Sequence, residues 1–160
     1  MVGHMSYDTV TKVVDSFEAV RRIENYDEKA GVLIFKKFFS LEPRAIKVFS
    51  FGRNIDSYSE DLLGNRQVIE HGKHYVKMVS RAIDLLGPDI ELLTEILLEL
   101  GKQHERFGVQ PEFYPPMGQA LLSALSELLG DKFSEPVRAA WVECYQVLAE
   151  DMIRATKAKA

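Results

Sequence analysis

The chain of 160 residues contains a single cysteine, Cys144, so it cannot form an internal disulfide bond. No apolar run approaches the roughly 18 residues that a membrane-spanning helix needs, and the start shows no apolar leader segment. The basic residues form no run, so nothing favours a nucleic-acid partner. A glycine-rich phosphate loop and a nucleophile elbow are missing as well. We therefore expect a cytoplasmic protein with neither a membrane nor a nucleic acid as its partner.

What the chain does contain is enough apolar material for one core. Hydrophobic residues make up 46% and charged residues 28% of the sequence, with a formal net charge of −4. This composition excludes a disordered chain, and the length suits one domain. We expect that single domain to span residues 6–160. The opening MVGHM resembles a cloning remnant, so His4 is left out of the search for a site.

Helical periodicity runs through the whole chain, and no convincing alternating strand is present. The expected class is therefore all-α, with about seven or eight helical pieces. Asn25 or Asp27 can cap the second helix, and the Pro115–Pro116 pair suits the first turn of a helix that starts late, near Tyr114. A polar loop is expected over residues 51–65. The expected helices cover approximately residues 7–23, 27–39, a short piece from 43, 66–86, 89–108, 114–129 and 135–154.

His104 lies near the middle of an apolar stripe, because helices advance roughly 100° per residue. The stripe consists of Leu93, Ile96, Leu97, Leu100 and Phe107. A histidine in that position points into the core. Two interpretations stay open from the residues alone: a buried, hydrogen-bonded core histidine, or a metal ligand.

A second helix offers another imidazole. His71 lies at the edge of its apolar stripe, whereas His74 is turned roughly 150° away and should face solvent. Two helices can thus each aim one imidazole toward a shared interior, which suits either packing or a haem iron. A zinc site is the weaker interpretation, because no cysteine or acidic residue has ligand-like spacing. Cys144 shares its stripe with Trp141 and is expected to pack rather than react.

Four segments resemble those of the globin family, in the same order and with similar spacing. They are LEPRAIKVF, VIEHGKHY, LGKQHERFGVQPEFY and FSEPVRAAW. The resemblance runs from about Tyr7 to Ile153 and is closest in character to neuroglobin-like globins. It implies the globin fold, a three-on-three sandwich of helices, together with a haem group.

The resemblance also implies roles for individual residues. His104 corresponds to the proximal iron ligand and His71 to the distal histidine. Phe49 would wedge against the porphyrin face, and Phe35 would line the distal pocket; both would also pack in the core, and in a globin the two roles hold together. The separation from Phe49 to His71 matches neuroglobin-like chains, whereas His74 would sit three residues too late.

Three further positions follow from the same resemblance. Val109 would touch the porphyrin edge, and His74 sits where the family often places a basic group near a haem propionate. Tyr75 would lie above the haem, one turn after His71. It departs from the family, which usually has a small aliphatic residue at that position. A tyrosine there would crowd a ligand or donate a hydrogen bond to it.

The function implied by the resemblance is reversible binding of a diatomic gas (oxygen, carbon monoxide or nitric oxide) by haem b. No Cys-x-x-Cys-His sequence exists for covalent attachment of the haem. His71 would coordinate the iron when no gas is bound. Two alternatives stay open. One is a redox enzyme (nitric oxide dioxygenase, nitrite reductase or weak peroxidase) that needs an external reductase, and the other is a haem-free regulator.

Overall fold

A computed structural model describes residues 4–49 and 64–157, and the described part of the chain is helical with no strand. The loop expected over residues 51–65 lies almost entirely outside it. The α-helices are α1 (Tyr7–Arg21), α2 (Tyr26–Leu41), α4 (Arg66–Leu85), α5 (Ile90–Arg106), α6 (Tyr114–Leu129) and α7 (Glu135–Lys157). Three short 3₁₀ turns, η2 (Pro43–Val48), η4 (Pro111–Phe113) and η5 (Gly130–Lys132), connect some of them.

Local signals in the sequence set most of the helix ends. The side chains of Ser6, Asn65 and Asp89 accept hydrogen bonds from first-turn backbone N–H groups of α1, α4 and α5, at 3.1, 2.8 and 3.0 Å. The late start of α6 at Tyr114 is confirmed, with prolines in its first turn. Asn25 does precede α2, but its side chain makes no capping hydrogen bond and its φ is 56°. Backbone conformation, rather than the predicted side-chain cap, therefore marks this helix start.

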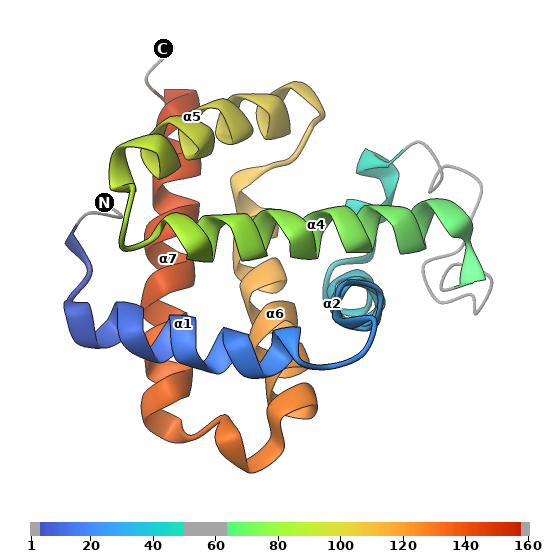
Figure 1. Ribbon diagram of the computed structural model, residues 1–160. Helices are drawn as coiled ribbons and strands as arrows, with labels where there is room; N and C mark the ends of the chain where they lie inside the picture. The colour runs from blue at the N-terminus through green and yellow to red at the C-terminus, as the bar shows by residue number, and fades with distance from the viewer. Residues whose placement is uncertain (1–3, 50–63, 158–160) are drawn as a thin grey trace.

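The helices form two crossed layers of three, which confirms the predicted three-on-three arrangement. One layer holds α1, α4 and α5, and the other holds α2, α6 and α7 (Figure 1). Across the layers, α4 packs on α2, and both α5 and α1 pack on α7. Within the first layer, α4 and α5 touch each other only sparingly. The two helices that carry the predicted histidines are thus held mainly by other helices.

The crossing of α2 and α4 is a contact between backbones. A Cβ atom built on Gly31 would lie 2.3 Å from the backbone carbonyl carbon of Gly72, and one on Gly72 would lie 2.8 Å from that of Gly31. Overpacking of this kind costs about 1–3 kcal/mol, because neither backbone has room to give way. The close approach matters for the site, because Phe35 lies one turn after Gly31 and His71 directly precedes Gly72.

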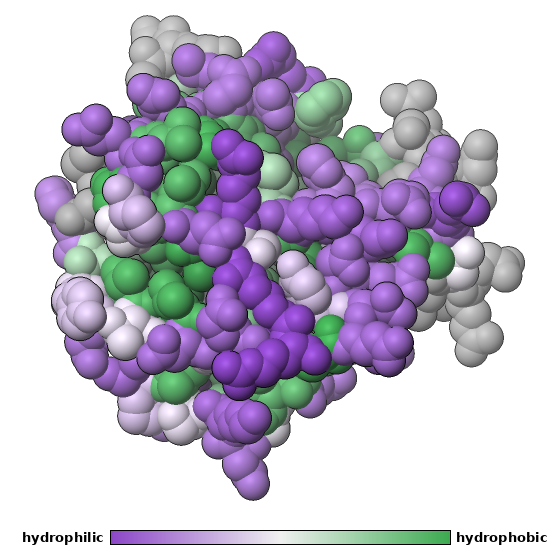
Figure 2. Space-filling view, in the orientation of Figure 1, coloured by the Kyte–Doolittle hydropathy of each residue, from purple (hydrophilic) through white to green (hydrophobic). Residues whose placement is uncertain are grey.

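One side chain departs from the predicted apolar stripe of α5. Phe107 is 71% exposed, because α5 ends at Arg106 and the chain turns away from the core there. Figure 2 shows polar residues spread over α4 on the visible face and apolar residues gathered toward the left, between α1 and α5. In the described residues, no helix is both long and apolar enough to cross a membrane.

Candidate functional site

The orientation of His104 is set by its own helix. The imidazole is half-buried in the last turn of α5, and its Nδ1 atom lies 2.7 Å from the backbone carbonyl oxygen of Leu100. A carbonyl can only accept a hydrogen bond, so Nδ1 carries the proton. In the neutral ring Nε2 then holds the free lone pair, which is the form of histidine that binds a metal.

Two tyrosines that the sequence analysis did not single out support this region. The ring of Tyr114 packs against His104, with 6.1 Å between centroids. The Tyr145 hydroxyl donates a hydrogen bond of 2.5 Å to the Tyr114 carbonyl oxygen. Its ring fits over Gly118, where an added Cβ would meet the Tyr145 Cε1 atom at 2.6 Å. The signal in the sequence was the place of Tyr145 on an apolar stripe, since a buried phenol needs an acceptor.

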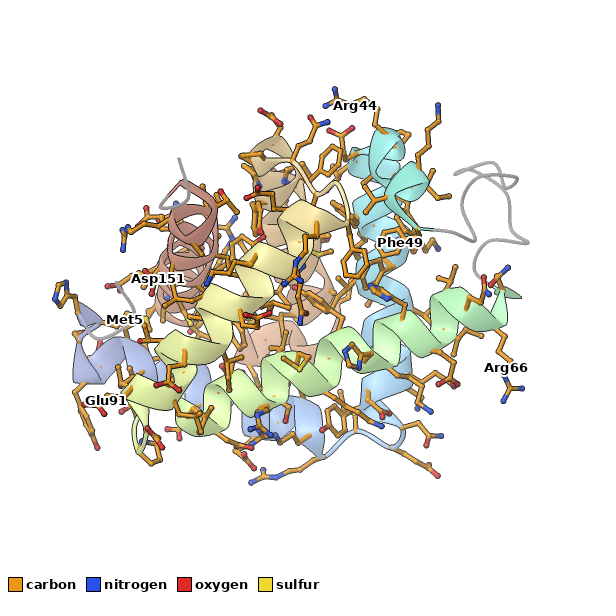
Figure 3. The ribbon with its side chains drawn as sticks, turned by 90° about the horizontal axis from the view of Figure 1, so that it is seen from above. Met5, Arg44, Phe49, Arg66, Glu91 and Asp151 are labelled. Atoms are coloured by element: carbon orange, nitrogen blue, oxygen red, sulfur yellow. The ribbon has the colours of Figure 1, made fainter. Side chains whose placement is uncertain are left out.

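On the facing side, His71 sits among aromatic rings. Its ring meets Phe49 edge to face, with centroids 4.6 Å apart, and meets Phe35 in the same way at 5.1 Å. Figure 3 shows Phe49 beside α2, near the upper end of α4. Phe35 is 2% exposed and also contacts Phe38, Phe39, Phe49 and Tyr75. Such ring pairs contribute about 0.5–1.5 kcal/mol each beyond their buried area, so they hold the His71 imidazole in a defined place.

His71 is neutral over most of the pH range. Burial, and to a smaller extent the charges of His74 and His104, lower the pKa of its imidazole to about 4. His74 is exposed, as the helical wheel predicted.

Tyr75 lies on the same face of α4, one turn after His71. Its ring meets Phe35 edge to face at 5.6 Å, and burial raises the pKa of its phenol, which stays protonated. No hydrogen bond joins its hydroxyl to another residue in the described part of the chain. Burial raises the pKa of Tyr145, and the phenol of Tyr75 raises it further.

Val109 follows the end of α5 on the proximal side. Its backbone N–H donates a hydrogen bond of 2.9 Å to the carbonyl oxygen of His104. Gly108 has a φ of 87°, which lets the chain turn so that the Val109 side chain packs against the core. Ring contacts thus join Phe35, Phe49, His71 and Tyr75 in one cluster, Val109 adjoins His104 through its backbone, and His74 is exposed.

The chemistry of this site fits a haem. His71 on α4 lies among aromatic rings, and the hydrogen bond that His104 donates from Nδ1 on α5 leaves its Nε2 atom free to bind a metal. Within the described residues, no group of three or more His, Cys, Asp or Glu side chains could hold a bare metal ion. Two imidazoles alone would leave such an ion short of ligands, whereas a haem iron brings four nitrogen ligands of its own.

The low pKa of His71 predicts a pH dependence for the protein without haem. The imidazole titrates near its ordinary value of 6.5 in the unfolded chain and near 4 in the folded one. The unfolded chain therefore binds more protons in between, and stability falls as the pH drops through this window. Urea unfolding at several pH values measures the effect. His71→Leu should flatten the slope between pH 6.5 and 5, whereas exposed His74→Leu should keep it, and an unchanged slope in His71→Leu would contradict the assignment.

Comparison with known proteins agrees with the fold and with the predicted resemblance. The family model described as Globin matches residues 32–152. Neuroglobin from Tetraodon nigroviridis is 31% identical over 124 residues, covering 78% of this chain and 77% of that protein. Neuroglobin-2 from Oncorhynchus mykiss is also 31% identical, with the same coverage.

Two solved structures share the arrangement of helices. A hexacoordinated haem protein from an anhydrobiotic tardigrade superposes with a TM-score of 0.84, at 18% identity and 96% coverage of each chain. A Drosophila melanogaster globin superposes with a TM-score of 0.80, at 23% identity and 94% coverage of each. At these identities the two structures support the fold alone. The family match and the neuroglobin relatives show that the chain belongs to the globin family and is of the neuroglobin type.

Proposed function

We propose that this globin binds one haem b without a covalent bond and reversibly binds a diatomic gas at its iron. The observations that support the proposal are the His104 ring, oriented by the Leu100 carbonyl, and the His71 ring, kept neutral by burial. In this proposal His104 is the proximal ligand and His71 the distal histidine. Haem, when bound, supplies an iron atom whose remaining coordination position accepts the gas.

The other residues shape the pocket around the two imidazoles. Phe35 and Phe49 would form an aromatic wall that excludes water, and Phe49 and Val109 would contact the porphyrin. The exposed His74 would pair with a propionate. Reduction of an oxidised iron would need an external reductase as a partner.

The test of the proposal is replacement of His104. His104→Ala removes the proximal lone pair, so the purified protein should lose most of its haem and recover it in part when imidazole is supplied. Absorption spectra of the ferric, ferrous and carbon-monoxide forms measure this. Acid–butanone should extract the colour from the wild-type protein, because the chain has no thioether attachment sequence.

Two results would overturn the proposal. A wild-type protein that shows no Soret band after expression with haem precursors would instead be a haem-free regulator. A His104→Ala variant with full haem content and an unchanged ferrous spectrum would show that another residue holds the iron. Replacement of exposed His74 by alanine is the matched control, and it should leave the ferrous band positions unchanged.

We also propose that His71 coordinates the iron when no gas is bound. The tardigrade protein is described as hexacoordinated, but the argument for this chain rests on His71 itself. Its lowered pKa leaves a lone pair on the ring, and Phe35 and Phe49 hold the ring from two sides. An exogenous gas would then have to displace it.

The deoxy-ferrous spectrum tests this coordination. Two sharp visible bands are expected for the wild-type protein, because two strong nitrogen ligands make ferrous haem low-spin. His71→Leu should replace them with one broad high-spin band and speed up carbon-monoxide binding. A broad band in the wild-type protein would rule out distal coordination without affecting the assignment of His104.

Tyr75 is the residue by which we propose that the pocket selects its gas. The ring stands against Phe35, burial keeps the phenol protonated, and its hydroxyl has no partner among the described residues. A phenol in this state is ready to donate to a ligand in the pocket. Oxygen gains more negative charge on binding than carbon monoxide does, so it benefits more from a donor.

Substitution of Tyr75 separates the effect of its hydroxyl from that of its ring. Tyr75→Phe keeps the bulk, and the loss of one hydrogen bond, about 0.5–1.5 kcal/mol, should speed oxygen dissociation up to roughly tenfold. Carbon-monoxide dissociation should barely change. Tyr75→Val also removes the ring and should speed the association of both gases. Stopped-flow and flash-photolysis rates measure both effects, and unchanged rates in both variants would show that the hydroxyl points elsewhere.

A further inference from the structure

The Leu100–Gly101 peptide unit makes two contacts that matter for the proximal histidine. Its carbonyl oxygen, on Leu100, accepts the hydrogen bond from His104 Nδ1 at 2.7 Å. Its other half, Gly101, is buried against the backbone of Met152 on α7. The peptide that orients the imidazole is therefore the same one that touches a different helix.

The contact with α7 leaves no space for a side chain. A Cβ atom on Gly101 would lie 2.3 Å from the Met152 carbonyl oxygen and 2.9 Å from its carbonyl carbon and Cα. All three atoms belong to the backbone of a long helix, so no rotamer change can relieve the clash. At Gly118, by contrast, the nearest atoms belong to the Tyr145 side chain.

The packing of α5 gives this contact its importance. Buried Leu93 and Leu97 lie on the same face of α5, two turns and one turn before Gly101. Most of the packing of α5 is against α7, and α4 touches it little (Figures 1 and 3). The position of α5, and of the imidazole near its end, thus depends on α7 far more than on the helix across the pocket.

We propose that the backbone contact between Gly101 and Met152 is a clamp through which α7 orients the proximal imidazole. The clamp holds the Leu100 carbonyl in place, and this carbonyl fixes both the tautomer and the tilt of the His104 ring. Gly101 is therefore a positioning residue for the iron ligand rather than a packing residue alone. The inference rests on the proposed haem binding.

Two variants disturb the clamp from opposite sides. Gly101→Ala adds the methyl group that the Met152 backbone excludes, so α5 must move away from α7. Thr156→Pro acts from α7, because a proline ring clashes with the carbonyl four residues earlier, which is that of Met152. Thr156 lies in the last turn of α7, so the rest of that helix can stay intact. The matched controls are Glu105→Ala, exposed on α5 beside His104, and Thr156→Ala, which keeps the backbone N–H.

The readout is the iron–imidazole stretching band in resonance Raman spectra. It is measured on the deoxy-ferrous protein in a His71→Leu background, so that His104 is the only imidazole on the iron. Both clamp variants should shift the band by several wavenumbers and broaden it. In a second measurement, both should speed haem transfer to apomyoglobin about tenfold, which is the lower end of the effect on metal affinity when a hydrogen-bond partner of a metal ligand is lost. Both controls should match the parent. Alanine ordinarily stabilises a helix relative to glycine. A urea midpoint lower for Gly101→Ala than for the parent would therefore support a clash with the Met152 backbone.

The outcomes separate this inference from the proposed function. A parent protein without haem would remove the proposed function and the inference with it. A parent that binds haem, with an unchanged band and unchanged haem loss in both variants, would overturn the inference alone. A band that moves in Gly101→Ala but not in Thr156→Pro would place the cause within α5 and overturn the role of α7. Should Gly101→Ala fail to fold, Thr156→Pro decides the matter.

Discussion

Two backbone contacts at glycines hold the helices that carry the histidines. Gly31 meets Gly72 where α2 crosses α4, and Gly101 meets Met152 where α5 crosses α7. Each contact ties one wall of the pocket to a helix of the other layer, while the two walls touch each other only sparingly. The positions of α4 and α5 are thereby set by their contacts with α2 and α7 of the other layer. A flat group can therefore bind between α4 and α5 without breaking the contacts that hold these two helices in the fold.

The two walls differ in chemistry. On α4, His71 and Tyr75 both pack against Phe35, so a change in the position of either ring affects the other. On α5, the imidazole of His104 is held by a hydrogen bond to its own helix and by the ring of Tyr114. The imidazole of His71 is thus held by ring contacts, whereas that of His104 is also fixed by a directional hydrogen bond.

Tyr75 is a position where this chain departs from the pattern that the resemblance implies. A phenol beside a neutral imidazole gives the distal side two groups able to donate a hydrogen bond, and burial keeps the phenol protonated. Tyr145 reaches the same region from α7, and its hydroxyl is already bonded to the Tyr114 carbonyl. Of these two tyrosines, Tyr75 is therefore the one whose hydroxyl is available to a ligand.

The sequence by itself determined the all-α class, most helix ends, the outward direction of His74 and the apolar faces that carry His71 and His104. These features depend on residues within one or two turns of each other, so helical periodicity and capping side chains reveal them. The tertiary structure decided the rest. It decided which helices cross closely at Gly31 and Gly101, and which acceptor the Tyr145 hydroxyl finds on Tyr114. It also decided that Phe107 is exposed, because the chain turns away from the core there. Local periodicity does not reveal these contacts between helices, because the contacting residues lie far apart in the chain.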